Sequence, residues 1–220
     1  MKILNWNVER YKKNKSEIDK IIYSYNADIV VLTETSSKLD LGNEYQPIKT
    51  ENLSNGFDGV QYDECENRVS IWTRYKILNK SKTYDEFTSV NTNLETEFGN
   101  LNVYATIIGV FGGKGERFNN DLNEQILDFH NFNSEEMNCI IGDLNTTFSG
   151  FTYPSHLARK VLNEQFSTLN MENVTKDIDN NVDHIIISNS FIKDKKIGID
   201  LFNTDKKLSD HIGICISISK

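Results

Sequence analysis

"KILNWNVERYKKNKSEIDKIIYSYNADIVVLTE", residues 2–34, decides how this chain folds. Residues 2–8 have the pattern of a short strand, and residues 28–34 that of a buried strand. Between them, residues 15–27 carry apolar side chains at helical spacing. Two strands joined by one helix imply a parallel pair with a crossover connection. The chain therefore begins as an α/β protein.

The rest of the chain adds short strands and then returns to the α/β pattern. Short β-rich runs, typical of antiparallel strands, are predicted at residues 68–74, 87–92 and 101–110. Later elements are predicted helices at 120–132 and 155–166 and predicted strands at 138–143, 182–188 and 211–219. We expect a layered α/β sandwich, with two mixed, mostly antiparallel sheets packed face to face and helices outside. Because no low-complexity linker interrupts the pattern, residues 1–220 should form one domain.

The composition limits the partners of the protein. With 24 Lys and Arg against 32 Asp and Glu, the net charge is -8, so no basic field exists to hold a polyanion by counterion release. The net charge disfavours nucleic acid as a partner but does not exclude it, because a bound divalent cation can supply positive charge locally. The 3 cysteines show neither a disulfide framework nor a metal-binding spacing, and no stretch approaches the roughly 20 apolar residues of a membrane span. We therefore predict a cytoplasmic protein.

Polar clusters lie where the predicted buried strands begin or end. These clusters are Asn7 with Glu9, Glu34, Asp143 with Asn145, Asp183, and Asp210 with His211. Burying an unpaired carboxylate is costly, so the clusters should meet around a cation or at a shared solvent-facing edge. Oxygen ligands with one or two imidazoles suit Mg²⁺ or Mn²⁺ better than zinc.

Each cluster also has a plainer interpretation. Asp143 and Asn145, in "CIIGDLN", could form a β-turn with local backbone bonds. The Asp210–His211 pair could belong to a loop or a cap, Glu34 could cap a helix, and Glu9 could be solvated. The order of all the clusters along the chain therefore carries more weight than any one of them.

That order, from "ILNWNVE" at residue 3 to "SDHIG" at residue 213, resembles the endonuclease/exonuclease/phosphatase superfamily of metal-dependent phosphoesterases. The resemblance covers nearly the whole chain. It implies hydrolysis of a phosphodiester, most often in nucleic acid, with Mg²⁺ or Mn²⁺ as cofactor. Alternatives are a phosphatase or phosphodiesterase acting on a small phosphorylated metabolite or lipid headgroup, and a binding module of the same fold with weakened catalysis.

The resemblance also implies catalytic roles. Asp143 would align or deprotonate the attacking water, and Asn145 would hold that water and a phosphate oxygen. His211 would contact the scissile phosphate, with its tautomer and charge fixed by Asp183. Asn7 would orient groups beside the metal.

Metal ligands and substrate contacts follow in the same way. Glu34 would be the principal metal ligand, with Asp210 at or near the metal and Glu9 as a second acidic ligand.

In the strand at 101–110, relatives commonly place a His or Tyr near the phosphate. Our alignment puts Thr106 there, with Tyr104 on the same face, and a shift of one residue would change which side chain is meant. The glycine-rich segment 109–117 lacks the P-loop spacing. Its Lys114 or Arg117 could meet a substrate phosphate or remain solvated.

Overall fold

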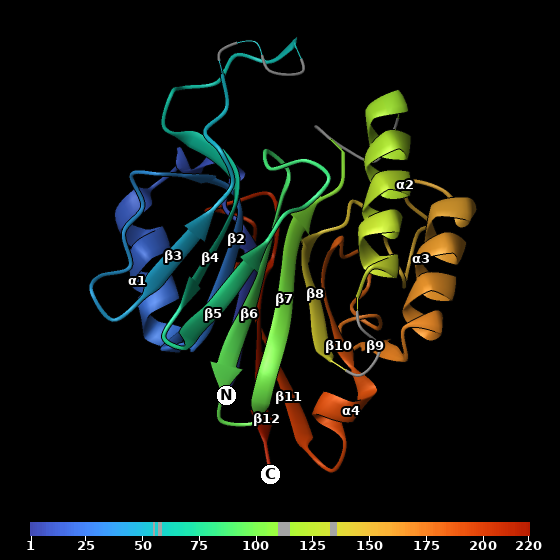
Figure 1. Cartoon of the computed structure of the whole chain (residues 1–220). Coiled ribbons are helices and arrows are strands. Elements are labelled where there is room, and N and C mark those ends of the chain that lie inside the picture. The colour runs from blue at the N-terminus through green and yellow to red at the C-terminus, as the bar shows by residue number, and fades with distance from the viewer. Residues whose placement is uncertain (55, 57–58, 110–114, 133–135) are drawn as a thin grey trace.

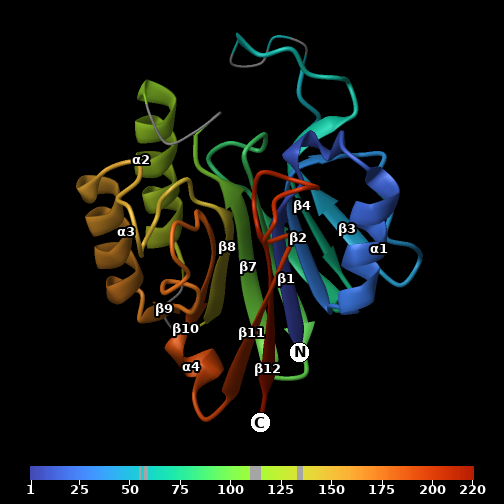
Figure 2. The same cartoon turned by 180° about the vertical axis from the view of Figure 1, so that it is seen from behind.

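The protein is described by a computed structural model over residues 1–54, 56, 59–109, 115–132 and 136–220. Within these residues, twelve strands form two six-stranded sheets that pack face to face, with helices on their outer sides (Figures 1 and 2). The predicted layered α/β sandwich is confirmed. No helix in these ranges is both long enough and apolar enough to cross a membrane.

The first sheet is built around the parallel pair predicted from residues 2–34. Its strand order is β11-β12-β1-β2-β4-β3, and β1 runs parallel to β2 while the other neighbours are antiparallel. The strands are β1 Lys2–Asn7, β2 Ile29–Ser36, β3 Gln46–Lys49, β4 Glu66–Thr73, β11 Lys196–Phe202 and β12 Gly213–Ser219. Helix α1 (Lys15–Tyr25) forms the crossover and buries Ile18 and Ile22 against the sheet.

The second sheet repeats this plan. Its order is β5-β6-β7-β8-β10-β9, with β7 parallel to β8 and the other neighbours antiparallel. The strands are β5 Lys76–Ser81, β6 Ser89–Thr96, β7 Gly99–Ile107, β8 Met137–Asp143, β9 Met171–Asn173 and β10 Asp183–Ser188. Helices α2 (Glu116–His130) and α3 (His156–Thr168) cover its outer face, and the short α4 (Asn189–Ile192) follows β10 (Figure 1).

The main core lies between the sheets. Val31 and Ile71 of the first sheet and Val103, Ile141 and Ile185 of the second belong to one buried cluster. Side chains alternate along a strand, so the neighbours of these residues face the outer helices. Each fully buried aliphatic side chain contributes about 1.5–3 kcal/mol by leaving water.

The four strands that the sequence did not predict are the four edges of the sheets: β3, β5, β9 and β11. Strands β5 and β11 are exposed at most positions, so they lack the alternation of a half-buried strand. Strands β3 and β9 are only 4 and 3 residues long.

The polar strand ends gather at one end of the sandwich. Both parallel pairs finish there, and the antiparallel strands β10 and β12 begin there. The two chain termini lie together at the opposite end (Figure 1). The clusters predicted at strand ends are therefore brought to one end of the molecule.

Candidate active site

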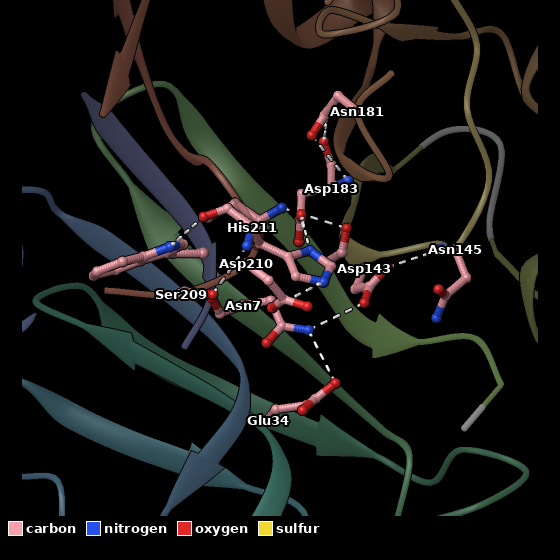
Figure 3. Close-up of polar contacts among 12 residues, drawn as sticks. Asn7, Glu34, Asp143, Asn145, Asn181, Asp183, Ser209, Asp210 and His211 are labelled. Carbon is pink, nitrogen blue, oxygen red and sulfur yellow. Dashed lines mark hydrogen bonds and ion pairs between the residues drawn. The ribbon is translucent and has the colours of Figure 1, made fainter. Parts of the chain in front are cut away.

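Asn7, on β1, connects acidic groups from two other strands, β2 and β8. The side chain of Asn7, at the end of β1, faces the second sheet, and its Nδ2 donates to Glu34 Oε1 at 3.2 Å and to Asp143 Oδ2 at 3.1 Å (Figure 3). Its Oδ1 accepts from the backbone N–H of Glu9 at 2.9 Å. Asn7 is fully buried, so these bonds hold the two carboxylates at fixed positions beside each other.

The backbone of Glu34 breaks the alternation of β2. A regular strand would point this side chain toward α1, together with Val30 and Leu32. Glu34 instead has a φ of 47°, in the left-handed region that non-glycine residues seldom occupy. This conformation lets its carboxylate reach Asn7 on the side that faces the second sheet.

His211 and Asp183 form the second half of the site. Asp183, at the start of β10, is 1% exposed, and its Oδ2 lies 2.6 Å from Nδ1 of His211 (Figure 3). Burial by itself lowers the pKa of His211, but the charges of Asp183, Asp143 and Asp210 together with the Asp183 hydrogen bond raise that pKa to about 10. His211 is therefore an imidazolium at neutral pH in the metal-free protein.

The loop before β12 is fixed by its backbone and by Ser209. The Ser209 hydroxyl donates to the carbonyl of Asn7 at 2.7 Å and accepts the N–H of His211 at 3.1 Å. The carbonyl of His211 accepts from Trp6 Nε1 at 3.2 Å and from Asn203 Nδ2 at 2.7 Å. His211 is thereby positioned by residues of β1 and by its own loop.

Asp143 lies between these two halves. Burial, the largest effect, raises the pKa of Asp143 to about 7; the charge of His211 opposes this rise, whereas Asp183 and Glu34 add to it. Such a carboxyl group is only partly ionised at neutral pH, because burial and the neighbouring acids disfavour its charged form. A cation bound nearby would favour the charged form.

A cation has suitable ligand atoms in this region. In the described part of the chain, Asp143, Asp183 and His211 each offer one ligand atom, and these atoms lie within 4.8 Å of one another. Asp183 Oδ1 is buried without a hydrogen-bond partner among those residues. The imidazole is held as a cation by Asp183, so the carboxylate oxygens are the better donors. Such oxygens suit a hard divalent ion.

The other two acids predicted to bind metal lie nearer the surface. Glu9 Oε2 accepts the backbone N–H of Asp210 at 3.1 Å and pairs with Lys13 at 2.6 Å. The Asp210 carboxylate is 70% exposed and lies 3.8 Å from Nε2 of His211. The structure therefore brings both residues beside the site, and their roles as ligands stay predictions.

Asp143 and Asn145 form a local turn as well as part of the site. Strand β8 ends at Asp143, and Asn145 follows in the left-handed region with a φ of 46°. The Asn145 N–H donates to Asp143 Oδ1 at 2.9 Å, and Asn145 Nδ2 donates to the carbonyl of Ile108 at 2.9 Å. The local turn is therefore present, and the two side chains do not simply continue a strand. The catalytic roles of Asp143 and Asn145 stay predictions.

The structure does not bring the predicted substrate contacts on β7 into the site. Tyr104 belongs to the cluster under α2, and its hydroxyl bonds to Ser89 and Asp128. Thr106 is fully buried and pairs with Gly142 rather than with Asp143. Both side chains alternate away from the inner face, and the residue paired with Asp143 is Ile107. A shift of one residue would place Ile107 there instead, and Ile107 belongs to the buried cluster between the sheets.

Arg117 lies on α2 and is bound to acids. Its Nη2 pairs with Asp85 at 2.8 Å and its Nε with Asp121 at 3.1 Å. Lys114, considered with it, lies outside the described residues. The role of Arg117 in substrate binding is therefore not supported by its contacts.

Several residues that support the site were not predicted. Ser209 and Arg68 were not considered, and Asn181 was missed although its side chain bonds to both backbone groups of Asp183. His184 is fully buried and bonds to the carbonyls of Thr146 and Asn181 at 3.0 Å. Burial lowers the pKa of His184 to about 4, so it is a neutral structural residue.

Comparison with known proteins identifies the family. A sequence model of the Endonuclease/Exonuclease/phosphatase family matches residues 4–211. The chain belongs to this family. Membership makes it a hydrolase that acts on phosphoester bonds, and it agrees with the acidic site at the sheet edge. No curated protein matches the chain in sequence.

Solved structures with the family's fold cover nearly all of the chain. An AP endonuclease from Archaeoglobus fulgidus has 12% identity and a TM-score of 0.73, with 99% of this chain and 98% of that chain covered. The 3'-5' exonuclease NExo from Neisseria meningitidis has 12% identity, a TM-score of 0.69 and full coverage of both chains. The human Nocturnin catalytic domain with bound sulfate has 16% identity and a TM-score of 0.69, with 100% and 93% covered. At these identities the likeness shows the fold.

Proposed function

We propose that this hydrolase cleaves phosphodiesters of nucleic acid with Mg²⁺ or Mn²⁺ and that Asp143 positions and deprotonates the attacking water. The observation that carries the proposal is the placement of Asp143 between the Asn7–Glu34 pair and the His211–Asp183 pair. A base whose pKa lies near the working pH is well suited to accept a proton. The pKa of Asp143, raised to about 7 by burial and neighbouring acids, meets this requirement in the metal-free protein.

His211 supplies positive charge toward the phosphate. Its Nδ1 is occupied by Asp183, so the second N–H of the imidazolium is at Nε2. Among the described residues, no group forms a hydrogen bond with Nε2, and the nearest acid, Asp210, is 3.8 Å away. Nε2 can therefore donate to a phosphate oxygen and stabilise the charge that develops there.

The two asparagines position the other groups. Asn7 uses its amide N–H groups on Glu34 and Asp143, so it orients both carboxylates. One Nδ2 hydrogen of Asn145 is used on Ile108, which leaves a second hydrogen for a water or phosphate oxygen.

A divalent ion fits the donors of this site. Hard oxygen ligands are offered by the carboxylate of Glu34, by Oδ1 of Asp183, which has no hydrogen-bond partner among the described residues, and by the exposed carboxylate of Asp210. We propose Glu34 as the principal ligand, with Asp210 and Glu9 on the solvent side. When bound, the ion would neutralise charge on the phosphate oxygens and lower the pKa of a coordinated water.

The family supports nucleic acid as the substrate class, whereas the net charge of the chain argues against it. Similar solved structures include an AP endonuclease and a 3' phosphatase bound to a DNA hairpin. The net charge of -8 instead favours a smaller phosphate ester, which needs no basic surface. A small phosphorylated metabolite is therefore our second candidate substrate.

The three cysteines are free thiols, in keeping with the predicted cytoplasmic location.

A substrate panel tests the proposal. Plasmid, abasic oligonucleotide, single-stranded RNA and small phosphate esters would each be incubated with the protein plus Mg²⁺, Mn²⁺ or EDTA. Metal-dependent cleavage of a nucleic acid by the wild type, lost in Asp143→Asn, is expected. Asp128→Asn is the matched control, because Asp128 is also hydrogen-bonded but belongs to α2, on the outer side of the second sheet. Turnover of small esters alone would replace nucleic acid with the second candidate substrate. Equal background rates in all three proteins would reject the enzyme.

A further inference from the structure

Arg68 is a buried cation next to the acidic site. It lies on β4 and is 3% exposed. Thr33 pairs with Val69 and Thr35 with Asn67, so Arg68 stands across from Glu34 on the neighbouring strand. The side chain reaches the other sheet, where its Nη2 donates to the carbonyl of Gly109 at 2.5 Å.

That contact places Arg68 beside the segment that holds Asn145. Asn145 Nδ2 binds the carbonyl of Ile108, and Arg68 binds the carbonyl of the next residue, Gly109. The Ile108 N–H in turn donates to the carbonyl of Asp143 at 2.9 Å. The guanidinium and the amide of Asn145 are thus bound to consecutive peptide groups of one short segment, which is attached to the backbone of Asp143.

The charge of Arg68 is not neutralised by the contacts of the described residues. Its Nη1 is buried without a hydrogen-bond partner, and no carboxylate oxygen in the described ranges lies within 4.0 Å of its nitrogens. Asp121, on the far side of Gly109, is already bound to Gly109 N–H, Arg117 and Tyr84. A buried guanidinium whose Nη1 has no hydrogen-bond partner is costly unless an anion or a water completes it.

Arg68 and Glu34 both line a small cavity, together with Arg10, Glu66 and Asn67. This cavity has a volume of about 10 Å³, and the carboxylate of Glu66 in its lining is bound by Arg10. A space of this size holds about one water molecule or one oxygen of a ligand. An oxygen placed there would contact Arg68 on one side and lie near Glu34 on the other.

We propose that Arg68 binds a non-bridging oxygen of the substrate phosphate through Nη1, as a phosphate-binding residue supplied by β4. This inference rests on the proposed function. The site holds the acids Glu34, Asp143 and Asp183 but one imidazolium, so a phosphate needs further positive charge there. A guanidinium suits this task, because it keeps its charge at all working pH values and its fork of N–H groups matches phosphate oxygens.

Binding of inorganic phosphate tests the inference without turnover. The dissociation constant for phosphate in the presence of Mg²⁺ would be measured by calorimetry for the wild type, Arg68→Gln and Asp143→Asn. We expect Arg68→Gln to weaken phosphate binding at least tenfold. Arg68→Lys keeps a positive charge but lacks the fork of N–H groups, so its affinity for phosphate should lie between those of the wild type and Arg68→Gln. Arg74→Gln is the control, since Arg74 lies beyond the other end of β4 and contacts Glu44 and Asn26.

The outcomes separate this inference from the proposed function. Arg68→Gln that melts like the wild type and binds phosphate with unchanged affinity would overturn the role of Arg68, and would mean that a water completes the guanidinium. A wild type that binds phosphate through Arg68 but hydrolyses no ester would contradict only the proposed function. If Arg68→Gln does not fold, NMR of the guanidinium groups of the wild type tests the inference instead. The Arg68 signal is identified by its absence from the spectrum of Arg68→Lys. Added phosphate must shift this signal, and an unmoved signal would reject the proposal.

Discussion

Replacing Asp183 with asparagine should turn His211 from a cation into a neutral imidazole at pH 8. In the wild type, Oδ2 of Asp183 lies 2.6 Å from Nδ1 of His211, and the surrounding carboxylates raise the pKa of His211 to about 10. Asp183→Asn removes the nearest charge but not the burial, which lowers the pKa. We therefore expect a pKa near or below about 6.5, the ordinary value for histidine.

The energy involved follows from that shift. One pKa unit corresponds to about 1.4 kcal/mol, so a fall in the pKa from about 10 to about 6.5 is on the order of 5 kcal/mol between the two protonation states of His211. Because the folded pKa is raised, this pair stabilises the wild type fully below about pH 6.5, and the stabilisation is lost as the pH rises through about 10. The variant should lack this loss of stability between those two pH values.

The assay is an NMR titration of the histidine ring protons in EDTA, with urea unfolding measured across the same pH range. His184 serves as an internal reference, since burial lowers its pKa to about 4. Asp210→Asn is the control, because its exposed carboxylate is 3.8 Å from Nε2 and should shift the pKa by less than about one unit. A wild-type His211 that titrates near 6.5, or equally in the wild type and Asp183→Asn, would refute the reasoning.

Two further substitutions probe the scaffold of the site. Gly142→Ala should destabilise the protein by roughly 3 kcal/mol or more in urea unfolding, because Gly142 has a φ of +140° and a Cβ there would lie 1.9 Å from the carbonyl oxygen of Thr106; an unchanged midpoint would contradict the structure of this pair. Ser209→Ala should cost about 1–2 kcal/mol and lower kcat more than it raises KM, because Ser209 bonds to Asn7 and His211 but faces no substrate. An effect on KM alone would argue against this positioning role.

The centre of the fold could be predicted from the sequence, whereas its edges could not. Strands β1, β2, β8, β10 and β12 are buried on both faces or paired on both sides, so their apolar runs identify them. The edge strands pair on one side and are short or polar. Their positions depend on a neighbour that only the folded sheet supplies.

The sequence indicated which polar strand ends lie together, but it predicted neither the direction of Glu34 nor the side chains of β7 that face the site. Polar residues at these ends of the buried strands had to lie close together, because the ends meet at one end of the sandwich. The direction of Glu34, however, depends on a φ of 47° that its residue type does not encode. On β7, the register with β8 decided that Ile107 and not Thr106 faces Asp143.

The sequence around Arg68 indicates that this residue needs a partner. It immediately precedes the apolar run Val69–Trp72, within a strand buried at every position. A charged residue in such a strand requires a partner, as a carboxylate does. The same reasoning that selected the acids at the strand ends would have selected this cation.

The most direct test of the account compares kcat for hydrolysis of a generic aryl phosphodiester by the wild type, Asp143→Asn, His211→Gln and the double variant, all with saturating Mg²⁺ or Mn²⁺. If the two residues act together on one phosphate, each single substitution should lower kcat about 100-fold or more, and the double variant should be about as slow as the slower single variant. A single variant that keeps the wild-type rate, or a double variant whose loss is the full product of the two single losses, would contradict a shared catalytic site.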